Sequence, residues 1–153
     1  MLARLGTALL GLALAAAVLV LPSPAQAVTP TEYASAAFST TNKVRANHDR
    51  AKLKASTCLK KAAVRQAKLM AGKSDIFHQL LGPLLDGCLL TMVGENVAYG
   101  YPDGKTVVRK GWMKSPGHRA NILRKGYTHM GIAARKSDEG VWYVAQVFGT
   151  PLS

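Results

Sequence analysis

The chain has 153 residues, of which 48% are hydrophobic, and its 20 Lys and Arg residues against 8 Asp and Glu residues give a net charge of +12. A chain of this length forms one compact domain with a core and is too short for two such domains. The charge predicts adsorption to anionic surfaces such as phospholipid headgroups, wall polyanions or nucleic acid.

Residues 1–27 have the pattern of a secretory signal peptide. Arg4 is the only charge in this segment, an apolar run follows it, and the segment ends in the small-x-small sequence Ala25-Gln26-Ala27. We expect cleavage before Val28, which removes Arg4 and leaves a mature domain of residues 28–153 with a net charge of +11. An uncleaved membrane anchor is the alternative, but the apolar run is shorter than the ~20 residues that span a bilayer.

The first half of the mature chain predicts two helices. Residues 32–50 place apolar and small side chains at helical spacing after a cap at Thr29 or Thr31. A second helix over 58–72 follows caps at Ser56 or Thr57 and ends at Gly72. Its outer side carries basic residues that suit either a docking surface or an ordinary solvated face.

The second half predicts two more helices and then a hairpin. Periodicity is unclear over 73–94, a third helix is expected over 104–114, and a short fourth helix begins at the cap Ser115. Residues 129–135 and 141–149 alternate like strands and are joined by a turn. Because both faces of the last strand are apolar, we expect an α+β fold: a three-layer α-β-α sandwich with a small antiparallel sheet covered by helices on both faces.

Cys58 and Cys88 are the two cysteines of the chain. In an exported protein such a pair favours one disulfide, which would join the second helix to the loop that follows His78. The alternative is a two-cysteine metal site, which the absence of a CxxC spacing disfavours.

The candidate site rests on three residues. His118 follows the helix start at Ser115, where free N–H groups and the helix dipole favour a neutral ring. Together with His78 and Glu95 it makes a His/Glu/His set, which is a familiar donor set for Zn²⁺ with an open fourth position. The simpler interpretation of Glu95 is a cap or an ion pair with a nearby basic residue.

Three other sites fit the sequence less well. A Ser115–His118–Glu95 triad is disfavoured because capping explains Ser115 and no GxSxG elbow is present. His48 and His129 fit surface or edge positions better than a metal site. Specific nucleic-acid binding rests on charge alone, since no recognition motif is present.

Five motifs occur in the order and spacing of the bacterial branch of the CAP superfamily, also called the SCP domain. They are "FH" at 77–78, "GENVAYG" at 94–100, "GWMKSPGHRANIL" at 111–123, "YTHMGIAA" at 127–134 and "WYVAQVFG" at 142–149. The segment "TNKVRANH" is also similar to the opening Asn-x-x-Arg helix of that family. The resemblance covers essentially the whole mature chain and implies an α-β-α sandwich.

The resemblance also implies a cleft lined by two His and two acidic residues that binds a divalent metal, often zinc. His78, Glu95 and His118 match three of these four positions. Lys114 and Ser115 stand where the second Glu is expected, which makes the site less anionic. Members of the family are described as sterol or lipid binders, defence proteins, toxins and proteases.

We therefore expect a secreted, monomeric and non-catalytic binding protein at or outside the cell envelope. Its cleft of His78, Glu95, Ser115 and His118 would bind Zn²⁺, another divalent metal or a small ligand, and its basic surface would meet an anionic envelope or lipid headgroups. The alternatives are a metal-assisted hydrolase of peptide or cell-wall bonds, in which Glu95 and His118 would be catalytic, and a lipid-binding protein.

Overall fold

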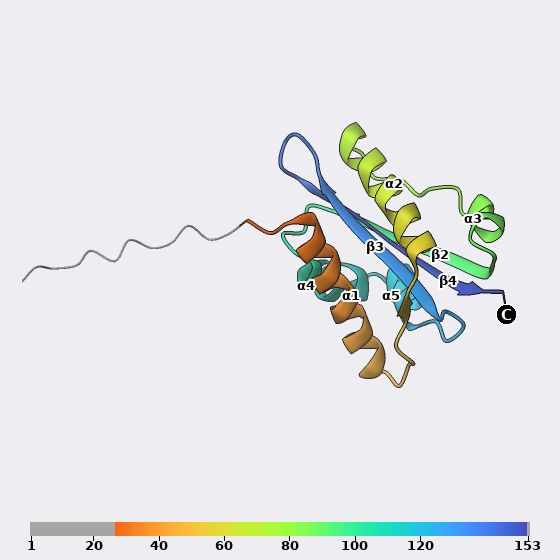
Figure 1. Ribbon diagram of the computed structural model, residues 1–153. Helices are drawn as coiled ribbons and strands as arrows, with labels where there is room; N and C mark the ends of the chain where they lie inside the picture. The colour runs from red at the N-terminus through yellow and green to blue at the C-terminus, as the bar shows by residue number, and fades with distance from the viewer. Residues whose placement is uncertain (1–26, 153) are drawn as a thin grey trace, which may run out of the picture.

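The computed structural model describes residues 27–152, so the predicted signal peptide falls almost wholly outside the described part. Four strands form one sheet with helices on both sides, α2 and α3 on one side and α1, α4 and α5 on the other (Figure 1). The expected sandwich is thereby confirmed. None of the helices within the described range is long and apolar enough to cross a membrane.

The two long helices begin at capping residues that the sequence suggested. Helix α1 spans Pro30–Ala46, and Thr29 caps it in a capping box with Glu32. Helix α2 spans Thr57–Lys73, and the Ser56 side chain accepts a hydrogen bond from the N–H of Leu59. It runs one residue beyond the expected stop at Gly72 and ends at Ser74, which is left-handed with φ of 48°.

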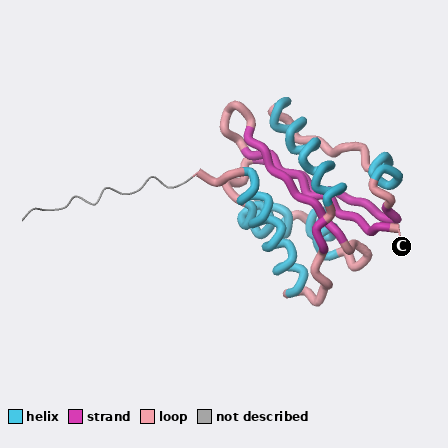
Figure 2. Tube along the Cα trace, viewed as in Figure 1, coloured by secondary structure: helices cyan, strands magenta, loops and turns pink. Residues whose placement is uncertain are grey.

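The shorter helices lie between successive strands of the chain (Figure 2). Helix α3 spans Gly82–Gly87 and lies in the stretch where the sequence shows no clear periodicity. The predicted third helix is one helical stretch of changing pitch. It consists of α4 (Gly104–Thr106), the π-helical η1 (Val107–Gly111) and the 3₁₀ turn η2 (Trp112–Lys114). Helix α5 spans Pro116–Leu123.

The sheet has the order β1-β3-β4-β2 and is mixed. Strand β4 (Trp142–Pro151) lies between β3 (His129–Lys136) and β2 (Leu90–Tyr99) and is antiparallel to both. The pairing of β3 with β4 is the hairpin that the sequence predicted. The two-residue strand β1 (Lys54–Ala55) is parallel to β3, so the antiparallel sheet that the sequence predicted has one parallel edge. Strand β2 is the opposite edge; the sequence indicated a strand edge or a tight turn around Glu95, between Val93 and Val97, but not a strand of ten residues.

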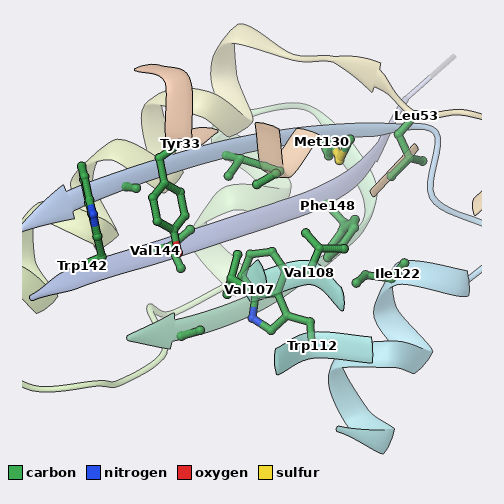
Figure 3. Packing of buried hydrophobic residues seen from close by; sticks show 14 of the residues in the cluster. Tyr33, Leu53, Val107, Val108, Trp112, Ile122, Met130, Trp142, Val144 and Phe148 are labelled. Atoms are coloured by element: carbon green, nitrogen blue, oxygen red, sulfur yellow. The ribbon is translucent and has the colours of Figure 1, made fainter. Parts of the chain in front are cut away.

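Alternate residues of β4 enter two separate cores, as the two apolar faces predicted. Trp142, Val144 and Phe148 pack with α1, η1 and α5, where Trp112 is fully buried (Figure 3). Tyr143, Ala145 and Val147 pack with α2 on the other face. Gly131 of β3 permits the close approach of α2, because an added Cβ there would lie 2.1 Å from the main-chain nitrogen of Lys60.

Cys58 and Cys88 form the expected disulfide. Cys58 lies in the first turn of α2 and Cys88 caps the C-terminus of α3. The bridge therefore closes a segment that contains α2, the loop with His78 and α3.

Candidate functional site

Glu95 lies in β2 with no part of its side chain exposed, and its carboxylate is occupied by two neighbouring residues. Oε1 accepts hydrogen bonds from Nδ1 of His78 at 2.8 Å and from the N–H of Gln79 at 3.2 Å. Oε2 accepts a hydrogen bond from the side-chain amide of Gln79. Glu95 thus holds the loop of residues 77–79 against the sheet.

The His78 ring is fixed on one side and open on the other. Since a carboxylate has no proton to give, Nδ1 of His78 donates in this pair, and the neutral ring then carries its lone pair on Nε2. The His78 side chain is 57% exposed. This is the arrangement in which a buried carboxylate sets the tautomer of an imidazole that binds a ligand with its other nitrogen.

The loop that carries His78 is bonded to helix α2. The main-chain oxygen of Phe77 accepts a hydrogen bond from the buried Gln66 of α2. Nζ of Lys73 lies 5.2 Å from the centroid of the Phe77 ring. These contacts and the disulfide fix the residues on both sides of His78.

His118 approaches β2 from the other helical layer, in the first turn of α5. Its main-chain oxygen accepts a hydrogen bond from Nδ2 of Asn96 at 3.1 Å. Burial lowers the pKa of the half-buried ring, and the charge of His78 lowers that pKa further. Both effects favour the neutral ring that the sequence predicted at this helix start.

Glu95 and Asn96 are consecutive, so their side chains point to opposite faces of the sheet. Glu95 bonds His78 on the face of α2, and Asn96 bonds the main chain of His118 on the face of α5. The two imidazoles therefore approach the free edge of β2 from the two helical layers. We call His78, Gln79, Glu95 and His118 the β2-edge site.

The free edge of β2 is covered by side-chain donors from the layer of α5. Three alternate main-chain carbonyls in the middle of this edge each accept one hydrogen bond at 3.1 to 3.2 Å. The pairs are Tyr127 Oη to Val93, Asn121 Nδ2 to Glu95 and Trp112 Nε1 to Val97. Gly94 makes room for this cover, because an added Cβ there would lie 2.0 Å from the Tyr127 hydroxyl oxygen.

A buried chain of polar side chains connects α5 to α1 along one face of the sheet. Nδ2 of Asn121 donates to Oδ1 of Asn96 at 3.0 Å, and Nδ2 of Asn96 donates to Oε1 of Gln146 at 3.2 Å. Nε2 of Gln146 donates to the hydroxyl of Thr41 at 2.9 Å. Asn96, Gln146 and Thr41 are fully buried. We call these four residues the amide chain.

The C-terminal end of α5 is held by two arginines. The buried Arg45 donates from Nη1 to the carbonyls of Ile122 at 2.7 Å and Arg124 at 3.0 Å. Arg50 donates from Nε to the carbonyl of Leu123 at 3.0 Å. Positive charge at the carbonyl end of a helix also interacts favourably with the helix dipole.

The predicted site residues make different kinds of contact in the structure. The His78 ring bonds the Glu95 carboxylate, and His118 bonds the next residue of β2, Asn96, through its main-chain oxygen. Ser115 lies at the N-cap of α5, but its hydroxyl makes no capping hydrogen bond, so its predicted role as a side-chain cap is wrong. Among residues 27–152, no group of three or more His, Cys, Asp or Glu side chains is placed to hold a metal ion. Lys114, at the position of the expected second Glu, is exposed.

The other two histidines make local contacts. Nδ1 of His48 lies 2.9 Å from the carbonyl oxygen of Val44, and Nδ1 of His129 lies 2.9 Å from the hydroxyl of Thr128. A hollow of about 580 Å³ lies between α1, α2 and β3, and another of about 470 Å³ lies beside the start of α1. Neither hollow is lined by the residues of the β2-edge site.

Sequence reasoning missed the residues that hold the site together. They are Arg45, Gln79, Asn96, Asn121 and Gln146. For Asn96 and Gln146 a signal was available, because each is a polar residue inside an apolar strand, in "ENVAY" and "VAQVF". A buried side-chain amide in such a strand needs a hydrogen-bond partner, so two such amides indicate that the two strands are neighbours and that the amides bond each other. For Gln79 we find no such signal.

The profile of the family described as "CAP: Cysteine-rich secretory protein family" matches residues 38–148. Two curated proteins of Bacillus subtilis (strain 168) are similar over shorter stretches. YkwD is 35% identical over 91 residues, which are 55% of this chain and 35% of YkwD. YlbC, described as a membrane protein, is 51% identical over 39 residues, which are 26% of this chain and 11% of YlbC. The match thus spans about a third of YkwD and a ninth of YlbC.

Solved structures share the fold. An extracellular protein with an SCP domain from Bacillus anthracis has a TM-score of 0.68 and 24% identity, over 79% of this chain and 41% of that one. An outer surface protein from Borrelia burgdorferi has a TM-score of 0.67 and 21% identity, over 75% and 90% of the two chains. NaASP2, whose crystal structure was determined with Zn²⁺, has a TM-score of 0.60 and 11% identity, over 86% and 85%.

Proposed function

The chain belongs to the cysteine-rich secretory protein (CAP) family, and we propose that it is an exported, non-catalytic binding protein whose β2-edge site takes a divalent metal ion through His78 and His118. The observation that carries this proposal is the buried Glu95 carboxylate bonded to Nδ1 of a His78 ring that is more than half exposed. That pairing prepares Nε2 of His78 for a ligand outside the protein.

Glu95 fits the role of an orienting carboxylate better than that of a metal ligand. Both of its oxygens already accept hydrogen bonds from His78 and Gln79, and its side chain is shielded from solvent. We therefore assign the metal to the two imidazoles, with water or a ligand supplying the other donors. A lowered pKa keeps His118 neutral and able to coordinate. Zn²⁺, when bound, would supply a Lewis acid.

Such a site holds its metal less tightly than one with two carboxylate ligands. Lys114 and Ser115 stand where a second acid would add negative charge. The remaining coordination positions stay open, which suits a site that binds a small polar ligand together with the ion. The net charge of +11 of residues 28–153 supports residence at an anionic envelope surface or lipid headgroups after export.

Zinc titration of the purified protein by isothermal calorimetry tests the proposal. We expect one site per chain, at least a tenfold weaker affinity in Glu95→Gln, and loss of most binding in His78→Ala and His118→Ala. The matched control is His48→Ala, which removes a histidine elsewhere and should bind zinc like the wild type. Failure of the wild type to bind zinc, or an equal loss in His48→Ala, would refute the proposal.

The same variants separate binding from catalysis. The pairing of His78 with Glu95 is also the arrangement of a general base, so peptide, ester and peptidoglycan substrates should be offered to the zinc-loaded protein. We expect no turnover. Turnover that is lost in Glu95→Gln, with the fold intact by circular dichroism, would make the protein a metal-assisted hydrolase instead.

Export is tested separately from the site. We expect the extracellular form to begin at Val28, as the Ala25-Gln26-Ala27 sequence predicts. N-terminal sequencing of the protein from the medium and from the membrane fraction decides this. An intact Met1 in a membrane-embedded product would contradict export as a free protein.

A further inference from the structure

The side chains of residues 115–117 do little to fix the first turn of α5. The hydroxyl of Ser115 makes no capping hydrogen bond, and Pro116 has no N–H to donate. A Cβ added at Gly117 would meet nothing within 4 Å, so no neighbour packs against this position. The arginine bonds described above hold only the opposite end of the helix. The position of the first turn is therefore set by its entry from the buried Trp112, whose carbonyl accepts a hydrogen bond from the N–H of Ser115 at 3.2 Å, and by contacts of His118 and the residues after it.

Asn96 makes the contact that joins this turn to the sheet. Its Nδ2 donates to the carbonyl of His118 itself at 3.1 Å, and its Oδ1 accepts from Asn121, nearly one turn later, at 3.0 Å. Asn121 also donates to the carbonyl of Glu95 at 3.1 Å. These three bonds fasten the start of α5 to residues 95 and 96 of β2.

The orientation of the Asn96 amide is fixed by the main-chain carbonyl of His118, which can only accept a hydrogen bond. Nδ2 of Asn96 therefore faces His118, and it also donates to Oε1 of Gln146. A flipped amide would place its oxygen against the His118 oxygen and its nitrogen against Nδ2 of Asn121, which donates to the Glu95 carbonyl and to Asn96. These contacts allow one orientation of Asn96 whichever way the Thr41 hydroxyl bonds Gln146.

We propose that Asn96, bonded to the His118 carbonyl and joined by Asn121, is a positioning residue that sets where the His118 ring lies relative to the His78–Glu95 pair. Two consecutive residues of β2 then align the two imidazoles. Glu95 aligns His78 through its side chain on one face of the sheet, and Asn96 aligns His118 through its main chain on the other. This inference rests on the proposed function for its zinc measurement, and a second measurement is independent of zinc.

The test compares Asn96→Asp with Thr41→Val. Asn96→Asp keeps the shape and the acceptor for Asn121 but turns an oxygen toward the carbonyl of His118. Thr41→Val also keeps the shape and removes a buried hydrogen bond of the same amide chain, at its far end in α1, where the Thr41 hydroxyl bonds Gln146 and not α5. Both variants should lower the melting temperature, so a general loss of stability is matched between them.

In zinc titrations well below both melting temperatures, we expect Asn96→Asp to bind at least tenfold more weakly than the wild type and Thr41→Val to stay within twofold. In the metal-free protein, the His118 ring resonances in ¹³C–¹H spectra should shift or broaden in Asn96→Asp, while those of His78 stay in place. Equal changes in both variants, or an unchanged His118 ring in Asn96→Asp, would overturn the inference.

These outcomes separate the two proposals. If the wild type binds no zinc, the proposed function fails, while the His118 resonances still decide whether Asn96 positions the ring. If Asn96→Asp does not fold, Asn121→Ala takes its place, because Asn121 is only half-buried and its loss removes one hold on Asn96. The same shift of the His118 resonances, without a shift of those of His78, is expected there.

Discussion

The two histidines of the β2-edge site are held in different ways. The His78 ring is held directly, by a charged hydrogen bond from its Nδ1 to the buried Glu95 carboxylate. His118 is held through its main chain, by Asn96 at the first turn of α5 and by arginines at the other end of that helix. One ring is more than half exposed on a loop, and the other is half-buried on a helix.

This difference shows how one edge strand can organise both helical layers. A loop has little rigidity of its own, so the His78 ring needs a strong side-chain partner. A helix is rigid along its length, so fixing its two ends fixes the main-chain positions from which its side chains extend. Each half of the site should therefore respond to its own set of changes.

The largest effect should come from breaking the C-terminal hold on α5. In Arg45→Met the buried carbonyl of Ile122 loses its donor, as do the partly buried carbonyls of Ala51 and Arg124, and each unsatisfied buried group costs about 1 to 3 kcal/mol. We expect the free energy of unfolding to fall by about 4 kcal/mol in urea titrations followed by tryptophan fluorescence. Arg50→Met, which loses the bond to Leu123, is the control and should cost about 1 kcal/mol. A similar cost for both variants would contradict this account of α5.

The half of the site that contains His78 should respond to loss of the Cys58–Cys88 disulfide. Its cysteines are 30 positions apart, and the chain-entropy relation gives about 3.5 kcal/mol for a loop of that length. In the double variant Cys58→Ser/Cys88→Ser we expect this loss of stability together with faster amide hydrogen exchange over 75–81. Exchange in α5 should change only as much as global stability does. Equal local acceleration in both regions would mean that the disulfide does not act on the His78 loop in particular.

The third prediction concerns pH and separates His118 from the rest of the molecule. Because the pKa of His118 is lowered in the folded protein, the unfolded chain binds a proton more readily. The contribution of His118 to the free energy of unfolding is complete above its ordinary pKa of 6.5. It is lost as the pH falls through that pKa and then through the lowered pKa of the folded protein. From about pH 7.5 to about pH 5, with chelator present, the wild type should lose more unfolding free energy than His118→Gln. The difference should be small, since the ring is only half-buried, and identical losses would refute it.

The fold could be predicted largely because its signals are local. Capping at Thr29 and Ser56, the alternation of β4 and the turn before it are all visible within a few residues, and the structure has each of them. Strand β2 was predicted only as a strand edge or a tight turn around Glu95, because its residues 90–96 mix exposed, half-buried and buried positions and include Gly94, which masks the alternation. Helix α3 is only six residues long, too short for a helical period to show.

The site was predictable only in part, for a related reason. Glu95, His78 and His118 are the residue types that chemistry requires, so they stand out in a chain with few acids and histidines. Their supports are amides and arginines whose partners are main-chain carbonyls far away in sequence, such as Asn96 with His118 and Arg45 with Ile122. A carbonyl belongs to every residue, so no sequence pattern identifies these partners.

The smallest effect is expected at Ser115, where sequence and structure disagree. A serine at the start of a helix predicts a cap worth about 1 kcal/mol. Its hydroxyl makes no capping bond in α5, whereas the Ser56 hydroxyl accepts from the N–H of Leu59 at 3.3 Å in α2. Ser115→Ala should therefore change the free energy of unfolding by no more than about 0.5 kcal/mol and leave zinc binding intact, while Ser56→Ala should cost about 1 kcal/mol. Urea titration of the two variants side by side measures this difference. An equal cost would mean that Ser115 does cap α5, and that the first turn of this helix has a hold of its own besides Asn96.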